Sequence, residues 1–129
     1  KTDWDTALRE GDFFSIHMPL NDKTRGMFNE AAFSKMKPTA IIINTSRGPI
    51  IDERALYRAL TEHQINSAGL DVFEKEPVNH DNPLLTLDNI TGWYTEESQT
   101  ELKRKAAENV RDALITGRPK YAVNTIRPK

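Results

Sequence analysis

The sequence predicts an α/β fold whose core is part of a doubly wound parallel sheet. Residues 40–44 form a short apolar run with the composition of a strand that is covered by other elements, and residues 66–72 are predicted as the next strand. Segments with apolar residues at helical spacing lie between the predicted strands. Parallel strands need a long crossover connection, usually a helix, so strands that alternate with helices predict a parallel sheet.

The first half of the chain is expected to supply two helices and two strands. Residues 3–10 are predicted as a short helix, and residues 12–17 as a strand because they contain the strand formers Phe and Ile. Asn29 is expected to cap a helix that continues through Met36. Residues 40–44 form a continuous apolar run, as expected for a strand that is covered on both faces.

The second half continues the alternation and ends in the longest helix. Asp52 is a good helix cap, residues 66–72 are predicted as a strand, and residues 89–91 as a short fourth strand. Residues 95–116 are predicted as a helix that Gly117 stops. The apolar positions of this helix recur at helical spacing and are expected to form a buried stripe: Leu102, Ala106, Val110, Ala113 and Leu114.

Composition restricts the classes of function. The chain has 129 residues with 37% hydrophobic and 29% charged residues, which is typical of an ordinary globular domain. A net charge of −1 without a basic stripe argues against nucleic acid as a partner. The lack of cysteine excludes disulfides and thiolate metal sites. No apolar run is long enough to span a membrane, so a cytoplasmic location is expected.

Two charged side chains follow predicted strands, and they are the main functional candidates. Arg47 comes just after the apolar run of residues 40–44, and Glu76 follows the strand predicted at residues 66–72. In open α/β sheets, ligands bind at the carboxyl ends of the strands. A guanidinium there can bind a substrate carboxylate with two hydrogen bonds, and a carboxylate can tune a catalytic acid or base.

Several motifs together resemble the D-2-hydroxyacid dehydrogenases. They are Ser-Ile-His-Met-Pro-Leu at residues 15–20, Asn-Thr-Ser-Arg-Gly at 44–48, Gly-Leu-Asp-Val-Phe at 69–73, and the pair Glu76-Pro77. The resemblance covers nearly the whole chain. It implies a Rossmann-like nucleotide-binding domain, of which residues 1–129 would be the carboxyl-terminal part with a long helix and tail.

The resemblance also implies an activity and site residues. Members transfer a hydride between a nicotinamide cofactor, most often NAD, and a 2-keto or 2-hydroxy acid, and they form homodimers. Arg47 would bind the substrate carboxylate and keto oxygen, and Glu76 would hydrogen-bond a catalytic histidine. The remaining candidates would contact the cofactor: Thr45 and Ser46 along its length, Asp71 near the nicotinamide amide, and His17 and Pro19 on the adenosine side.

The chain departs from the family pattern at three points. It contains no G-x-G-x-x-G turn and no substrate-capping domain. The family's catalytic histidine, in a Pro-His pair, is expected between Ile90 and Trp93, where about five residues are missing by family spacing. Either the loop is deleted, or the residues are absent from this sequence. A true deletion favours the alternative hypothesis of a non-catalytic, nucleotide-binding and dimerising module, of the type that the family's transcriptional corepressors represent, or an inactive fragment.

The three histidines of the sequence are His17, His63 and His80. His63 is expected at a helix end, where an imidazolium suits the helix dipole. His80 has no counterpart in the family motifs and is interpreted as a solvated loop residue. No His, Asp and Glu cluster has the spacing of a zinc site, so no catalytic metal is predicted.

Overall fold

Two units make up the chain in the computed structural model, Lys1–Trp93 and Tyr94–Lys129. The structure describes residues 1–92 and 96–122. The first unit holds a sheet with its helices, and the second holds one long helix. Within the described ranges, no helix is long and apolar enough to cross a membrane.

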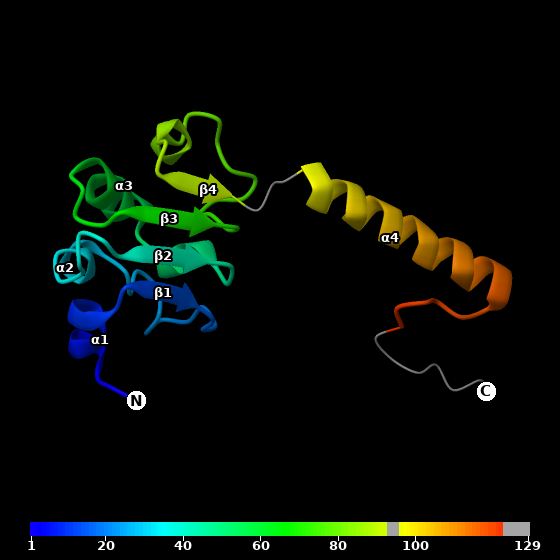
Figure 1. Ribbon diagram of the computed structural model, residues 1–129, viewed down its shortest axis with the longest axis horizontal. Helices are drawn as coiled ribbons and strands as arrows, with labels where there is room; N and C mark the ends of the chain where they lie inside the picture. Colours follow the sequence, from blue (N-terminus) through cyan, green and yellow to red (C-terminus); the bar gives the residue numbers. More distant parts are fainter. Residues whose placement is uncertain (93–95, 123–129) are drawn as a thin grey trace. The chain divides into compact units, whose positions relative to one another are not determined.

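The first unit is built on one parallel sheet (Figure 1), with strand order β1-β2-β3-β4. The strands are β1 (Phe13–Ile16), β2 (Ile41–Asn44), β3 (Ser67–Leu70) and β4 (Ile90–Gly92). All three neighbouring pairs are parallel. The predicted parallel α/β sheet is therefore confirmed. In a doubly wound sheet, the strands on one side of the point where the strand order reverses follow one another in chain order, as β1 to β4 do here.

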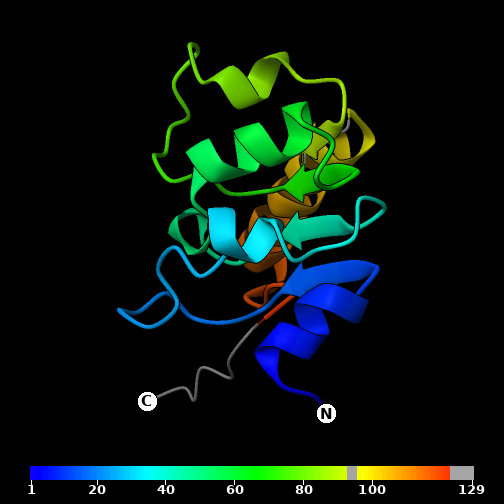
Figure 2. The same cartoon turned by 90° about the vertical axis from the view of Figure 1, so that its left-hand side faces the viewer.

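Three helices of this unit begin at capping residues that the sequence supplies. They are α1 (Trp4–Glu10), α2 (Glu30–Phe33) and α3 (Glu53–Thr61), and they lie in front of the strands in Figure 2. Their caps are the side chains of Asp3, Asn29 and Asp52, each of which accepts a hydrogen bond from a backbone amide of the first turn. Two 3-10 turns complete the unit, η1 (Gly48–Ile50) and η2 (Pro83–Thr86).

The core lies on one face of the central strands. Ile42 of β2 and Ala68 of β3 are buried there against the apolar residues of α2 and α3. Ile41 and Ile43 point to the opposite face and are only half-buried. The prediction that residues 40–44 are covered on both faces is therefore wrong for this structure. Right-handed crossovers between strands in chain order put α2 and α3 on the same side of the sheet.

One predicted helix is shorter in the structure. α2 ends at Phe33, whereas the sequence predicted that it continues through Met36. Met36 is still buried in the core, because the chain continues in turns after Ser34. Pro38 follows shortly, and a proline disfavours helical conformation at the residue before it.

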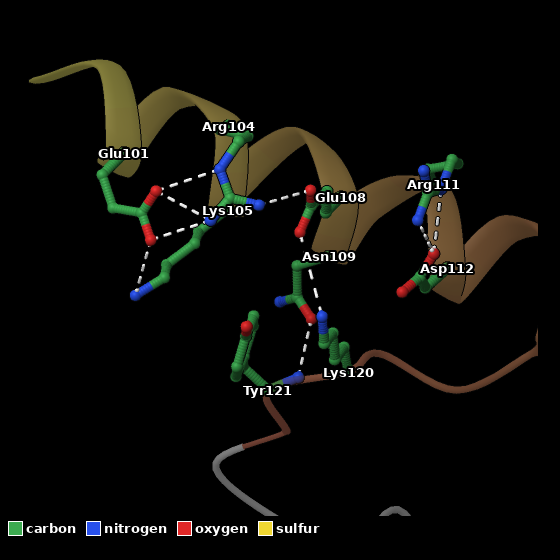
Figure 3. Close-up of polar contacts among 9 residues, drawn as sticks. All are labelled: Glu101, Arg104, Lys105, Glu108, Asn109, Arg111, Asp112, Lys120 and Tyr121. Atoms are coloured by element: carbon green, nitrogen blue, oxygen red, sulfur yellow. Dashed lines mark hydrogen bonds and ion pairs between the residues drawn. The ribbon is translucent and has the colours of Figure 1, made fainter.

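The second unit consists of α4 (Glu96–Thr116) and the segment that follows it. Gly117 ends the helix with a φ of 70°, a left-handed conformation that glycine adopts without steric cost. The chain then turns back, and the amide of Tyr121 donates to Asn109 Oδ1 at 2.9 Å (Figure 3). Arg104 forms ion pairs with Glu101 at 2.7 Å and with Glu108 at 2.6 Å.

The predicted buried stripe of α4 is exposed. Leu102 and Val110 are each 61% exposed, and Leu114 is 81% exposed. Within the described residues of its own unit nothing covers this stripe, and its burial in the complete domain stays a prediction. An amphipathic helix needs a second layer to bury its apolar face, and a unit that contains a single helix provides none.

Candidate functional site

A cavity of about 480 Å³ lies where β1 and β2 end. It is lined by residues of the two loops that follow these strands: His17, Met18, Pro19, Leu20, Ser46 and Arg47. Four of these residues were predicted as site residues from the sequence. Met18 and Leu20 were not, although they flank Pro19 in the same motif. The cavity thus brings together Arg47, which was expected to bind the substrate, and His17 and Pro19, which were expected to contact the adenosine side of the cofactor.

Asn44 shapes the loop that carries Arg47. Its side chain is fully buried at the end of β2. Asn44 Oδ1 accepts from the Ser46 amide at 3.0 Å, and Asn44 Nδ2 donates to the Arg47 carbonyl at 3.0 Å. Buried polar groups need such partners, so Asn44 fixes the turn. Sequence analysis gave this residue no role of its own, although a polar residue that ends an apolar run is a visible signal.

Side-chain hydrogen bonds connect the two loops around the cavity. Ser46 Oγ donates to the Met18 carbonyl at 2.6 Å and so links the β2 loop to the β1 loop. Thr24 Oγ1 donates to the Pro19 carbonyl at 2.7 Å. His17 Nε2 lies 2.7 Å from Ser15 Oγ. The cavity wall is therefore held by contacts between loops as well as by the strands.

Arg47 presents its guanidinium at the exposed rim of this cavity. One nitrogen, Nη1, donates to the Ser46 carbonyl at 2.8 Å. Among the described residues, no carboxylate lies within ion-pair distance of Arg47. The planar guanidinium has five N–H donors in a fork that matches a carboxylate. This arrangement suits the binding of an anionic ligand.

Asp71, Thr45 and Glu76 lie outside the set of residues that line this cavity. The amide of Asp71 donates to the Asn44 carbonyl at 3.0 Å, which places Asp71 beside the end of β2. Thr45 is exposed in the same loop as Arg47. Glu76 is exposed in the loop after β3, and its Oε1 accepts from the Phe73 amide at 3.1 Å.

Gly48 brings the Glu76 loop against the Arg47 loop. A β-carbon at Gly48 would lie 1.9 Å from the Phe73 carbonyl oxygen, a distance that real side chains do not adopt. Only glycine lets the two backbones approach this closely. Arg47 and Glu76 are thus carried by loops that touch at Gly48 and Phe73. Sequence analysis did not identify this role for Gly48.

The pKa shifts that the structure resolves lie elsewhere. The backbone amide and the hydroxyl of Thr6 lower the pKa of Asp3 at the α1 cap. On α4, hydrogen bonds from Arg104 and then from Lys105 lower the pKa of Glu101. The pairing with Glu101 and Glu108 raises the pKa of Arg104, and Asp112 raises that of Arg111.

The remaining histidines lie away from the cavity. His63 follows α3 with a φ of 54°, at the helix end where the sequence placed it. His80 is exposed in the loop before η2. No cluster of His, Cys, Asp and Glu that could hold a metal ion occurs in residues 1–92 and 96–122. A break in the chain was expected between Ile90 and Trp93, but residues 90–92 are continuous and form β4. The link from Gly92 to Trp93 lies outside the described residues.

Comparison with known proteins assigns this arrangement to a family. Glyoxylate/hydroxypyruvate reductase B of Klebsiella pneumoniae (strain 342) is 45% identical over 127 residues, which cover 95% of this chain and 39% of the relative. A glyoxylate reductase structure from Paecilomyes thermophila has 35% identity and a TM-score of 0.66, covering 95% of this chain and 38% of that one.

A D-isomer-specific 2-hydroxyacid dehydrogenase from Lactobacillus delbrueckii ssp. bulgaricus, in its NAD-complexed form, has 30% identity and a TM-score of 0.62. The match covers 95% of this chain and 43% of that one. This chain therefore spans less than half the length of these relatives. Residues 1–92 match the family described as D-isomer specific 2-hydroxyacid dehydrogenase, NAD binding domain, and the chain belongs to this family.

Proposed function

We propose that the complete protein containing this chain is an NAD(P)-dependent oxidoreductase that interconverts D-2-hydroxy acids and 2-keto acids. The observation that carries this proposal is Arg47, whose guanidinium borders a cavity at the carboxyl ends of β1 and β2. The family match supports the same reaction class. Glyoxylate and hydroxypyruvate are the first substrates to test, because they are named for the 45% identical relative.

Arg47 would bind and orient the keto acid. Its fork of N–H donors can hold the substrate carboxylate and polarise the keto oxygen at the same time. Binding two groups of one small molecule fixes the face of the keto carbon that receives the hydride. The nicotinamide cofactor supplies the hydride when it is bound. Asn44 contributes by holding the Arg47 carbonyl, and hence the loop, in place.

The wall of the cavity has the chemistry that a dinucleotide needs. Met18, Pro19 and Leu20 offer apolar surface for a base, while Ser46 and His17 offer polar groups. Thr45 and Asp71 would extend this contact toward the nicotinamide amide, since Asp71 is tied to the end of β2. These residues suit NAD, the cofactor most frequent in the family, and none of them distinguishes NAD from NADP at the 2′-position of the ribose.

Glu76 would act through a histidine. A carboxylate that hydrogen-bonds an imidazole favours its charged form and fixes its tautomer, which allows the histidine to give a proton to the keto oxygen. We place this histidine in a Pro-His pair in the complete protein, between Ile90 and Trp93. This position follows from the spacing of the family motifs on either side of residues 90–93.

The proposal extends to the organisation of the complete protein. Residues 93–129 would belong to the same nucleotide-binding domain as residues 1–92, with α4 as its last helix. The protein would be a cytoplasmic homodimer, as the resemblance to the family implies. Its partners would be small acids and the cofactor.

A non-catalytic nucleotide-binding and dimerising module is the alternative. The observation that favours it is the sequence between Ile90 and Trp93, which contains only Thr91 and Gly92 and no histidine. Such a module would keep the cavity of β1 and β2 and would bind a nucleotide without turnover.

The deciding experiment is an assay of the complete protein. Purified protein is mixed with NADH or NADPH and a panel of 2-keto acids that includes glyoxylate, hydroxypyruvate and pyruvate, and the loss of reduced cofactor is followed by absorbance. Substrate-dependent oxidation of the cofactor is expected. Cofactor binding without oxidation by any acid of the panel contradicts the dehydrogenase proposal and supports the alternative.

A further inference from the structure

Glu53 and Glu74 hold each other through two reciprocal hydrogen bonds. The Glu53 amide donates to Glu74 Oε1 at 3.0 Å, and the Glu74 amide donates to Glu53 Oε1. Glu53 is the first residue of α3, where backbone amides have no partner within the helix. A carboxylate acceptor is favourable at this positive end of a helix. The start of α3 is thereby attached to the loop that follows β3.

The second oxygen of Glu53 binds the far arm of the same loop. Asn82 Nδ2 donates to Glu53 Oε2 at 2.7 Å. Asn82 is itself anchored, because its Oδ1 accepts from the Leu84 amide at 3.0 Å and Leu84 is fully buried. The Glu53 carboxylate therefore contacts the loop at two points. Its Oε1 binds Glu74, which precedes Glu76 in the chain, and its Oε2 binds Asn82, which follows it.

These contacts restrict where Glu76 can lie. Glu76 is exposed, and its carboxylate accepts from the Phe73 amide at 3.1 Å. Phe73 is held on its other side by close approach to Gly48, and Glu74 is held by Glu53. Joining the two arms of a loop at a fixed point lowers its conformational entropy. The contacts of Glu53 therefore restrict the conformations open to the segment that carries Glu76.

We propose that Glu53 is a positioning residue for Glu76, which it holds at the place where the loop meets the Arg47 loop. The catalytic consequence rests on the proposed function. Glu53 binds the Glu76 loop and would touch neither substrate nor cofactor. Removing its side chain should leave α3 in place, because the helix is anchored by its buried residues: Ala55, Leu56, Ala59 and Leu60.

The test compares Glu53→Ala with Glu30→Ala in the complete protein. Glu30 is a matched control because it is also the first residue of its helix, and its exposed carboxylate pairs with Arg58 at 3.0 Å. Hydrogen exchange of the Phe73 and Glu74 amides is expected to be roughly tenfold faster or more in Glu53→Ala, since a charge-assisted hydrogen bond is lost. Glu30→Ala should leave these amides as protected as in the unmodified protein.

Kinetics of the same variants test the catalytic consequence. Glu53→Ala is expected to lower kcat by about tenfold, with KM for the keto acid within about twofold, because Arg47 keeps its own contacts. Glu53→Gln should restore part of kcat, because its amide oxygen can still accept from the Glu74 amide, whereas its NH2 group cannot accept from Asn82 Nδ2. An equal loss of kcat in Glu30→Ala, or no recovery in Glu53→Gln, would overturn the positioning role.

The two measurements separate failure of this inference from failure of the proposed function. If the unmodified protein oxidises no cofactor with any keto acid, the proposed function fails, and the exchange data alone decide whether Glu53 holds the loop. If the protein is active but exchange at Phe73 and Glu74 is the same in Glu53→Ala and Glu30→Ala, the inference fails while the function stands.

Discussion

Gly48 and Phe73 approach so closely that no side chain fits between them. A β-carbon at Gly48 would lie 1.9 Å from the oxygen and 2.0 Å from the carbon of the Phe73 carbonyl. Gly48 is buried directly after Arg47, and Phe73 begins the turn that contains Glu76. The relative position of the two proposed catalytic side chains is thus set by a backbone contact.

Gly48→Ala is therefore expected to displace the Glu76 loop. The methyl group meets backbone atoms, which cannot move aside as a flexible side chain can. We expect a loss of about 1–3 kcal/mol in the free energy of unfolding, the usual effect of overpacking. Chemical denaturation measures it. Gly69→Ala is the control, because its β-carbon would meet only side-chain atoms at 3.7 Å or more. Equal stability of the two variants would contradict the argument.

Arg47→Lys tests the assignment of the substrate-binding cation. Lysine keeps the positive charge but cannot form the planar two-pronged contact with a carboxylate. We expect kcat/KM of the complete protein for 2-keto acids to fall by roughly tenfold or more, in line with the loss of one charge-assisted hydrogen bond. Arg58→Lys serves as the control, since Arg58 pairs with Glu30 on the outer surface of the helices. An unchanged kcat/KM for Arg47→Lys would contradict the assignment.

Asn44→Ala should lower the free energy of unfolding, although Asn44 contacts no ligand in the proposed function. It removes the buried acceptor of the Ser46 amide and the buried donor to the Arg47 carbonyl. Each of the two unpaired groups costs about 1–3 kcal/mol, so we expect a loss of roughly 2–6 kcal/mol in the free energy of unfolding. Asn66→Ala is a matched control, because Asn66 is exposed, and it should change stability by less than about 0.5 kcal/mol.

The pKa of Glu101 gives a test on the second unit. Hydrogen bonds from Arg104 and then from Lys105 lower this pKa below its ordinary value of 4.5. Because the folded-state pKa is depressed, the pairing stabilises α4 above the unfolded-state pKa, and this contribution is lost as the pH falls through the folded-state pKa. Carboxylate NMR titration should find the pKa below 4.5, and Arg104→Gln should raise it more than Lys105→Gln.

Arg118→Gln is the control for this titration, because Arg118 is not among the groups that shift Glu101. It should leave the pKa of Glu101 where it is. A pKa that stays unchanged in Arg104→Gln would show that another interaction is responsible for the shift.

The part of this site that could be predicted from sequence depends on residues that are close together in the chain. Arg47 and Ser46 follow an apolar run, so their place at the end of a parallel strand follows from the strand itself. The contact between Gly48 and Phe73 and the bonds between Glu53 and Glu74 join loops that are far apart in the chain. Spacing and propensity carry no information about which loops meet, so these contacts required the structure.

The fold shows the same difference between local features, which the sequence predicts, and contacts between distant elements, which it does not. Caps and apolar runs predicted the strands and most helix starts, because hydrogen bonding at Asp3, Asn29 and Asp52 is determined within one turn. Burial was predicted less well. Leu114 and Ile41 are apolar at the expected positions, but whether they are covered depends on which layer packs against them. Periodicity identifies an apolar face and cannot supply its partner.

The last prediction concerns the sequence between Ile90 and Trp93. Glu76 needs a histidine partner for the proposed reaction, and none of His17, His63 and His80 has been assigned that role. β4 ends at Gly92 beside Leu70 of β3, so residues inserted after it would emerge at the carboxyl edge of the sheet, where ligands bind. We expect the gene of the complete protein to encode about five further residues here, including a Pro-His pair.

Sequencing the gene across this region, together with the assay, decides between the two functions. If the pair is present, replacing its histidine by glutamine should abolish most turnover while the cofactor still binds, because general acid–base catalysis contributes about 10²–10⁴-fold. If the gene runs directly from Ile90 through Thr91 and Gly92 to Trp93, Glu76 has no imidazole to stabilise. The chain would then keep a nucleotide-binding cavity at β1 and β2 without the proton donor, and the binding-module alternative would replace the dehydrogenase proposal.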